Sequence, residues 1–288
     1  MTRRSATLRL LAVAAFLLAT TGWRADPATA RPLDEVRESG TIRIAVYRDF
    51  APFSEVSDGR FAGVDVDIAR AIAERLGLPV SLMPLTAGET VDDDLRNAVW
   101  KGHYLGGGVA DVMLHVPVDR RFALRNKQVA IFGPYARMRL VMAGSRDPDT
   151  GVTSLAELGE RSEGRVGVEI ATLADYYLLN AFGGSLRGRL VHYPTTIAAA
   201  DALRAGEVVA AFGTEAEIEA GLGPARKDFE ISPVEIPGST WLIGAAVDER
   251  SRDLGYAVGD IIAEMVESGK MTRTFLDHGL SYAPPDAE

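Results

Sequence analysis

The chain has 288 residues, of which 47% are hydrophobic and 25% charged, and its formal net charge is −9. Nucleic acids and anionic lipids need a basic footprint on the proteins they bind, so neither is expected as a partner. The chain contains no cysteine, which excludes disulfides and a lipid-modified N-terminal cysteine.

The first 30 residues have the features of a removable signal peptide. Three arginines precede a mostly apolar run, Leu10–Thr20, and an A-x-A cleavage sequence ends at Ala30. The apolar run is too short for a bilayer-spanning helix, which needs about 20 residues. Cleavage removes four arginines and one aspartate from 31 basic and 40 acidic side chains, which leaves 27 and 39, formally −12. We therefore expect a free periplasmic protein, and about 258 mature residues suit two domains.

A strand and a helix open the mature chain. Ile42, Ile44 and Val46 alternate with polar residues, which predicts a strand. Turns are expected at Ala51-Pro52 and at Asp58-Gly59. Apolar residues then recur at helical spacing between residues 63 and 77, which predicts an amphipathic helix.

The two ends of this helix also carry recognisable residues. Asp65 is the expected N-cap, because a short acidic side chain can accept a hydrogen bond from the first turn. Gly77 stands where a left-handed C-cap would end the helix.

Strands and helices alternate along the rest of the chain. The expected strands are Pro79–Pro84, Val109–Val116, Met138–Ala143, Leu190–Tyr193, Val208–Phe212 and Ile236–Val247. The expected helices are Asp92–Trp100, one that opens at Ala171, Ile197–Ala205, Leu254–Val266 and Met271–His278. Such alternation indicates α/β layers with largely parallel sheets.

The opening strand, the aromatic-proline loop and the GVDVDIA helix together resemble the type II periplasmic solute-binding proteins of the amino-acid-binding kind, solute-binding family 3. The resemblance extends from about Leu33 to Leu280. It implies an α/β fold of two lobes joined by two crossing segments. Lobe 1 would comprise residues 31–138 and 240–288, and lobe 2 residues 139–239, with hinge closure on a small solute.

The resemblance implies ligand contacts in the first lobe. Phe50 follows the first strand, where the family has an aromatic platform, and Tyr47 stands where the family often has an acid. His115 falls at a position of a small polar ligand contact. A satisfied structural histidine is the alternative, and a metal pair with His103 is a third. Trp241 lies near a crossing segment, where it either stacks on the ligand or packs in the core.

An arginine is expected to bind a ligand carboxylate, because a guanidinium presents a planar fork of donors. The segment RNKQVAIFGPY resembles the family's carboxylate-binding segment and selects Arg125, with Arg120 and Arg121 as rivals because of a local insertion. Thr172, at a helix start, would assist through its hydroxyl and the helix dipole, or serve only as an N-cap.

The resemblance fails at Thr214 and Glu215, where amino-acid binders usually have the aspartate that pairs with the ligand ammonium. Either Glu215 replaces that aspartate or the ligand is no ordinary amino acid. We favour the second interpretation and expect organic anions to bind better than amino acids.

The sequence thus predicts a periplasmic binding protein of an ABC-type importer, without cofactor or metal, that takes an amino acid or organic acid and docks on an inner-membrane permease. A rival function is that of an accessory protein of a quinoprotein alcohol dehydrogenase. Asp111–Pro117 (DVMLHVP) resembles a motif of the members of this superfamily that are associated with such dehydrogenases. An enzyme on the same fold, such as a dehydratase with Glu215 as acid or base, is the second rival.

Overall fold

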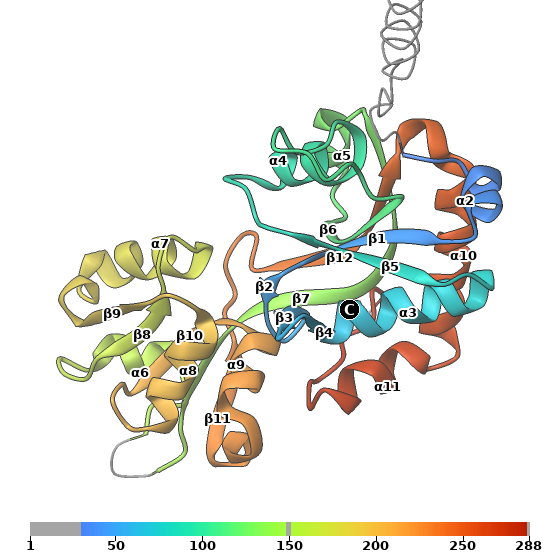
Figure 1. Ribbon diagram of the computed structural model, residues 1–288. Coiled ribbons are helices and arrows are strands. Elements are labelled where there is room, and N and C mark those ends of the chain that lie inside the picture. The colour runs from blue at the N-terminus through green and yellow to red at the C-terminus, as the bar shows by residue number, and fades with distance from the viewer. Residues whose placement is uncertain (1–29, 148–150, 287–288) are drawn as a thin grey trace, which may run out of the picture.

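The computed structural model describes residues 30–147 and 151–286. The expected signal peptide lies outside the described residues, apart from Ala30. Within the described ranges, no helix is long and apolar enough to cross a membrane. Two lobes lie side by side, joined by the long strand β7 (Val129–Ser145) and by the segment that leads into β12 (Thr240–Asp248) (Figure 1). The expected two-lobed α/β fold is confirmed.

The main strands follow one continuous order, β5-β1-β6-β12-β7-β10-β8-β9, with β11 also paired to β7. Beyond β7 and β12, these strands are β1 (Ile42–Tyr47), β5 (Val80–Leu85), β6 (Val112–Pro117), β8 (Val166–Glu169), β9 (Leu190–Tyr193), β10 (Ala210–Thr214) and β11 (Phe229–Pro233). The group β5-β1-β6 is parallel, and so is β10-β8-β9, whereas β7 and β12 run antiparallel to their neighbours. The sheets are therefore mixed, with parallel strands in each lobe.

Strand β7 changes partners near its middle. Arg139 pairs with Thr240 on β12, and the next residue, Leu140, pairs with Thr214 on β10. We propose this change of partner as the lobe boundary, at the position expected from the sequence.

Helices cover both faces of the first sheet. They are α2 (Leu33–Ser39), α3 (Val64–Leu76), α4 (Val91–Leu95), the π-helix η1 (Arg96–Trp100), α5 (Arg120–Arg125), the 3-10 turn η5 (Glu249–Ser251), α10 (Arg252–Glu267) and α11 (Lys270–Asp277). Ile42, Ile44 and Val46 of β1 join a core with α3 and α10, whereas Ala45 and Tyr47 join a second core under α4 and η1. This division follows the alternation of side chains along a strand, and Figure 1 shows the two helical layers on opposite sides of the sheet.

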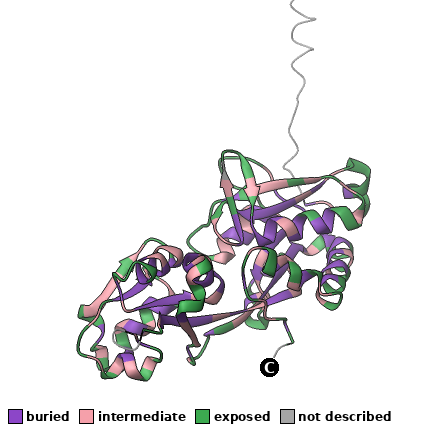
Figure 2. Ribbon diagram, turned by 90° about the horizontal axis from the view of Figure 1, so that it is seen from below, coloured by how far each residue is buried: buried purple, intermediate pink, exposed green. Residues whose placement is uncertain are grey.

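The second lobe repeats this arrangement on a smaller scale. Its helices are α6 (Leu155–Glu160), α7 (Leu173–Asn180), α8 (Thr196–Arg204) and α9 (Glu215–Leu222), with 3-10 turns η2 (Ala181–Gly184), η3 (Arg187–Arg189) and η4 (Gly223–Asp228). Two apolar clusters fill the two faces of its sheet. In Figure 2 the buried residues of both lobes follow the strands and the inner faces of the helices.

Helix α3 differs from the sequence expectation at its first turn. Its N-cap is Gly63, and Asp65 is the second helical residue, with a side chain that is only 1% exposed and caps nothing. Gly63 has φ +120°, and a Cβ at this position would lie 2.3 Å from the carbonyl oxygen of Phe53. This close approach fixes the helix start. The expected left-handed C-cap at Gly77 is confirmed, with φ +71°.

The segment after β5 also differs in detail. Thr90, whose hydroxyl accepts from Asp93 N, caps α4, and the helix continues as the π-helix η1 instead of one regular helix over Asp92–Trp100. A small separate sheet, β2 (Asp49–Phe50), β3 (Ser54–Ser57) and β4 (Arg60–Ala62), contains the expected turn at Asp58-Gly59.

Candidate ligand-binding site

A cavity of about 610 Å³ opens where the parallel strands of the first lobe end. Such carboxyl ends are the usual place for ligands in α/β proteins, because the loops there are free to form a crevice. The second lobe contributes Glu169, the last residue of β8. The lining residues are Tyr47, Arg48, Asp49, Phe50, residues 85–91, Asp94, His115, Pro117, Glu169, Trp241 and Ile243.

Aromatic side chains form one wall of the cavity. Tyr47 and Phe50 meet edge to face with ring centroids 5.8 Å apart, and Phe50 meets the ring of His115 at 4.8 Å. Trp241 lies on β12 beside the point where β7 changes partners. This wall suits the flat or aliphatic part of a solute.

The charged residues of the lining are mostly acidic. Asp49, Glu89, Asp94 and Glu169 supply four carboxyl groups, against the single guanidinium of Arg48. That guanidinium lies 3.3 Å from Asp49. A cation is therefore better matched to this cavity than an anion, because a desolvated charge needs an opposite charge beside it.

Asp94 is held at the base of the cavity. Its carboxyl group accepts from the Tyr47 hydroxyl at 2.7 Å and from the Gly88 backbone N–H at 2.6 Å. Burial raises the pKa of Asp94, although both hydrogen bonds oppose the shift, and burial beside Asp94 raises the pKa of Tyr47. Both pKa values rise because the low-dielectric surroundings disfavour the charged form of each group.

His115 belongs to a buried polar network. Its Nδ1 lies 2.9 Å from Asp65 Oδ2, and its backbone N–H donates to the Tyr135 hydroxyl at 3.0 Å. That hydroxyl donates to Asp65 Oδ1 at 2.7 Å. Burial raises the pKa of Tyr135, so the phenol stays protonated and keeps its role as a donor.

Two glutamates meet in the second lobe. Glu169 accepts from the Thr196 backbone N–H at 2.9 Å and from its hydroxyl at 2.8 Å. Glu217, 8% exposed, accepts from the Thr214 hydroxyl. Burial raises the pKa of Glu217 to about 7, and the charge of Glu169 contributes in the same direction.

The structure brings four of the eight expected contact residues to the cavity, namely Tyr47, Phe50, His115 and Trp241. Their roles as ligand contacts stay predictions.

The other four lie elsewhere. Arg125 ends α5 with its side chain exposed and 3.8 Å from Asp92, and its rivals Arg120 and Arg121 are exposed on the same helix. Thr172 caps α7 and Thr214 caps α9. Glu215 is bound at two points by Arg139, with distances of 2.6 and 2.7 Å. We therefore do not assign these four side chains to the cavity.

The sequence did not predict a functional role for Asp65, Asp94 or Glu169. Asp65 was expected only as an N-cap. Asp94 lies in a run of three aspartates, and no feature of the sequence distinguishes it from the other two. Glu169 is the last residue of β8, and its position directly after Val166–Val168 was the available signal. Among the described residues, no group of three or more histidine or acidic side chains could hold a metal ion. His103 and His115 therefore gain no third ligand.

Comparison with known proteins agrees with this architecture. The sequence model of the bacterial extracellular solute-binding proteins, family 3, matches residues 42–98. The expected resemblance to this family is confirmed over this segment. A stretch of 53 residues is 43% identical to the cyclohexadienyl dehydratase of Pseudomonas aeruginosa, and it covers 18% of this chain and 20% of that enzyme. The match thus spans about a fifth of this curated relative.

Solved structures extend the likeness to the whole fold. An ancestral cationic amino-acid solute-binding protein is 20% identical with a TM-score of 0.66, and the match covers 85% of this chain and 98% of that one. An amino-acid ABC transporter substrate-binding protein from Streptococcus pneumoniae, bound to L-arginine, is 22% identical with a TM-score of 0.56, covering 85% and 97%. At these identities the likeness shows the fold alone.

Proposed function

We propose that this protein is a periplasmic solute-binding protein that captures a small, positively charged solute in the cavity and presents it to an ABC-type permease. The observation that carries the proposal is the composition of the cavity wall. The lining combines the aromatic wall with four carboxyl groups, one of them contributed by the second lobe. The guanidinium of Arg48 is already paired with Asp49.

This proposal replaces the expected preference for organic anions. An anion in the cavity would lie among Asp49, Glu89 and Glu169 without the help of Arg125, which is on α5 and outside the lining. A cation instead gains an opposite charge from either lobe. Glu169 is then the group through which the second lobe favours the closed form, because it is that lobe's residue in the cavity lining.

The proposed role in transport depends on closure of the two lobes on the solute and needs no catalytic group. A binding protein needs differential affinity for its open and closed forms, and a membrane permease distinguishes the two. The family match over residues 42–98 and the two-lobed fold support this role.

A thermal-shift screen of the mature protein tests the proposal. L-Arginine, L-lysine and agmatine represent cations with and without a carboxylate, and citrate and glutarate represent anions. A ligand at one hundred times its dissociation constant adds about 2.7 kcal/mol to the free energy of unfolding. We expect stabilisation by at least one cation and by neither anion. Stabilisation by citrate or glutarate alone would overturn the proposed charge preference.

Glu169→Gln sharpens the test, because the variant removes the carboxylate of the second lobe but keeps an acceptor for Thr196. We expect at least tenfold weaker binding of the best cation by calorimetry. Glu163→Gln on the same lobe is the control, since Glu163 is exposed and lies outside the cavity lining.

Dehydration is a second candidate, because the 53-residue match is to a cyclohexadienyl dehydratase. The acid expected from the sequence, Glu215, is bound at two points by Arg139 and lies outside the cavity lining. We therefore expect no turnover of a cyclohexadienyl substrate. Turnover by the wild type would restore the enzyme hypothesis. Its loss in Glu215→Gln would assign the reaction to Glu215, and its survival would assign it to another group. If no small molecule binds, copurification with a quinoprotein dehydrogenase tests the accessory role.

A further inference from the structure

Strand β6 contains a bulge directly beside the cavity. Met113 pairs with Ala246 and Val116 pairs with Gly244, so two residues of β6, Leu114 and His115, face one residue of β12. His115 has φ +60°, in the left-handed region that few non-glycine residues adopt. Bulges re-aim a side chain and are common next to active sites, and such backbone conformations persist where the surroundings fix them.

The surroundings that fix His115 form a closed loop of hydrogen bonds. The bulge frees the His115 backbone N–H from the strand ladder, and the Tyr135 hydroxyl accepts it. The same hydroxyl donates to one oxygen of Asp65, and the other oxygen lies 2.9 Å from His115 Nδ1. A carboxylate only accepts hydrogen bonds, so this network assigns the proton of the neutral imidazole to Nδ1.

In this neutral form the remaining ring nitrogen, Nε2, is a hydrogen-bond acceptor. No side chain or backbone group in the described part of the chain is paired with it. The ring is packed between Phe50 and Phe53, with centroids 4.8 and 4.4 Å away, and its side chain is 10% exposed at the cavity wall.

Two other histidines of this chain pair with an aspartate, and they make the contrast clear. His192 and His278 bind Asp175 and Asp67 through Nε2, and neither lines the cavity. In both of these histidines the aspartate is bound by Nε2. In His115 the aspartate is bound by Nδ1, and the residue lies in a β-bulge.

We infer that Nε2 of His115 is the acceptor that fixes an N–H group of the solute, and that Asp65 and Tyr135 are positioning residues that hold its ring and tautomer. The inference rests on the proposed function and narrows its solute class to cations that carry N–H donors, such as primary amines and guanidines. The electrostatic attraction comes from Asp49, Glu89 and Glu169, which attract any cation. His115 would distinguish among these cations, because its Nε2 accepts a hydrogen bond only from an N–H group that points towards it.

A ligand-free measurement tests the availability of Nε2. Diethyl pyrocarbonate acylates a free imidazole nitrogen, and peptide mass spectrometry separates the four histidines of the chain. We expect His115 to be acylated in the wild type and its rate to fall at least fivefold in Asp65→Asn, because loss of the carboxylate favours the tautomer that carries its proton on Nε2. An unreactive His115 overturns the inference whatever the solute proves to be.

A spectroscopic signature tests the positioning residues. Long-range 15N–1H spectra distinguish the two imidazole tautomers, and His115 should show a protonated Nδ1 in the wild type. Asp65→Asn should shift it towards the tautomer protonated at Nε2, whereas Asp175→Asn should leave the His115 signals unchanged. A wild-type His115 protonated at Nε2 contradicts the assignment.

Binding of L-arginine tests the role of the acceptor. His115→Asn is the sharpest variant, because asparagine tolerates φ near +60° and still reaches Asp65 but has no atom at the place of Nε2. We expect at least tenfold weaker binding in His115→Asn and less than twofold change in His192→Asn. Equal affinities in both variants would make His115 structural only. If L-arginine does not bind the wild type, the proposed ligand class fails, and the acylation experiment still decides the inference.

Discussion

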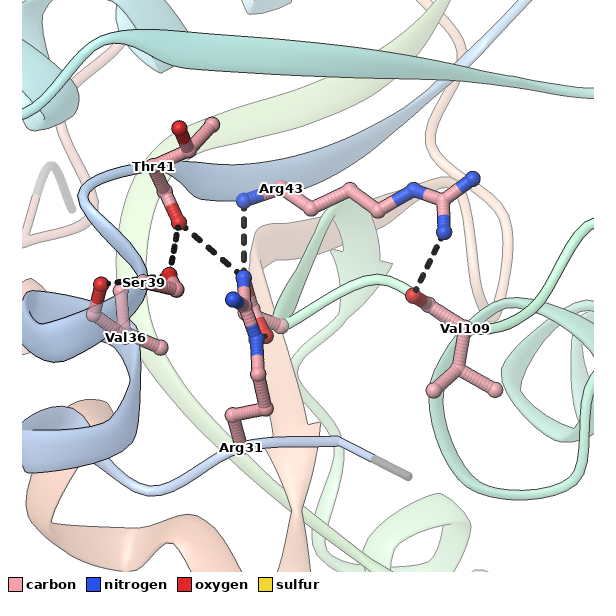
Figure 3. Close-up of polar contacts among 7 residues, drawn as sticks. Arg31, Val36, Ser39, Thr41, Arg43 and Val109 are labelled. Atoms are coloured by element: carbon pink, nitrogen blue, oxygen red, sulfur yellow. Dashed lines mark hydrogen bonds and ion pairs between the residues drawn. The ribbon is translucent and has the colours of Figure 1, made fainter. Parts of the chain in front are cut away.

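The guanidinium of Arg31 binds the carboxylate of Asp111 at two points, through Nε at 2.9 Å and through a terminal nitrogen at 2.6 Å, across 80 residues of sequence. Asp111 is 3% exposed and also accepts from the Arg43 backbone N–H. Arg31 donates further to the Thr41 carbonyl, and the Arg43 side chain reaches the Val109 carbonyl (Figure 3). The residue expected to begin the mature chain is thus tied to the starts of β1 and β6.

Arg31→Ala should destabilise the mature protein by about 2 kcal/mol, because it leaves a buried carboxylate with one donor in place of three. Chemical denaturation of a protein that begins at Arg31 measures the loss. Arg37→Ala is the matched control, since its guanidinium lies 3.8 Å from an exposed Asp34, and a pair of this kind contributes about 0–1 kcal/mol. Equal effects of the two variants would contradict the anchoring role.

Gly63→Ala should destabilise the first lobe by about 3 kcal/mol, because the new Cβ would overlap the Phe53 carbonyl in a backbone conformation with φ +120°. Gly77→Ala, with φ +71° and no atom within 4 Å of a Cβ, should cost only about 1 kcal/mol. Urea unfolding of both variants compares a steric effect with a purely conformational one. A Gly63→Ala protein as stable as Gly77→Ala would show that the α3 entry relaxes freely.

Stability should fall as pH rises from about 4.5 to about 7, through the titration of Glu217. Burial raises the pKa of this carboxyl group to about 7 in the folded protein, from 4.5. Between these values the folded state binds the extra proton, so its stabilising contribution is complete below pH 4.5 and is lost above pH 7. A difference of this size corresponds to up to about 3 kcal/mol.

Glu217→Gln should remove this pH dependence and raise the free energy of unfolding at pH 8. Unfolding at pH 5 and pH 8 measures the effect, with the exposed Glu207→Gln as control. If the wild type and Glu217→Gln follow the same pH profile, Glu217 is ionised throughout.

Trp241 should report solute binding by fluorescence. The described residues include two tryptophans, Trp100 and Trp241, and of these only Trp241 lines the cavity. Titration with the best cation should change the emission of the wild type and of Trp100→Phe but not of Trp241→Phe, whose affinity calorimetry checks separately. A signal that disappears only in Trp100→Phe would place the solute, or the structural response to it, away from the cavity.

Most of the fold could be predicted because local patterns agree with the tertiary structure. The alternation at Ile42, Ile44 and Val46 became one buried face of β1, and β9 begins at Leu190 and ends at Tyr193, as expected. Gly77 ends α3 because a left-handed residue is needed there.

The candidate site was harder to predict, because its chemistry depends on contacts between distant segments. The residues around Asp65 in the sequence fit an N-cap, and they do not show that its carboxylate contacts His115, which lies 50 residues further along the chain. Arg125 was selected by counting along a motif across a local insertion, and in the structure it ends α5 outside the cavity lining. The acidic lining arises from β2, the loop after β5, α4 and β8, whose proximity only the fold creates.

The position of β12 sets the order in which the molecule can assemble. This strand lies between β6 and β7, yet it begins at Thr240, more than a hundred residues after β6 ends. A chain emerging from a ribosome or a translocation pore can complete the smaller lobe while the larger one still has two open strand edges. The larger lobe is completed only when the last fifth of the chain is available, so its sheet cannot form fully before β12 is synthesised.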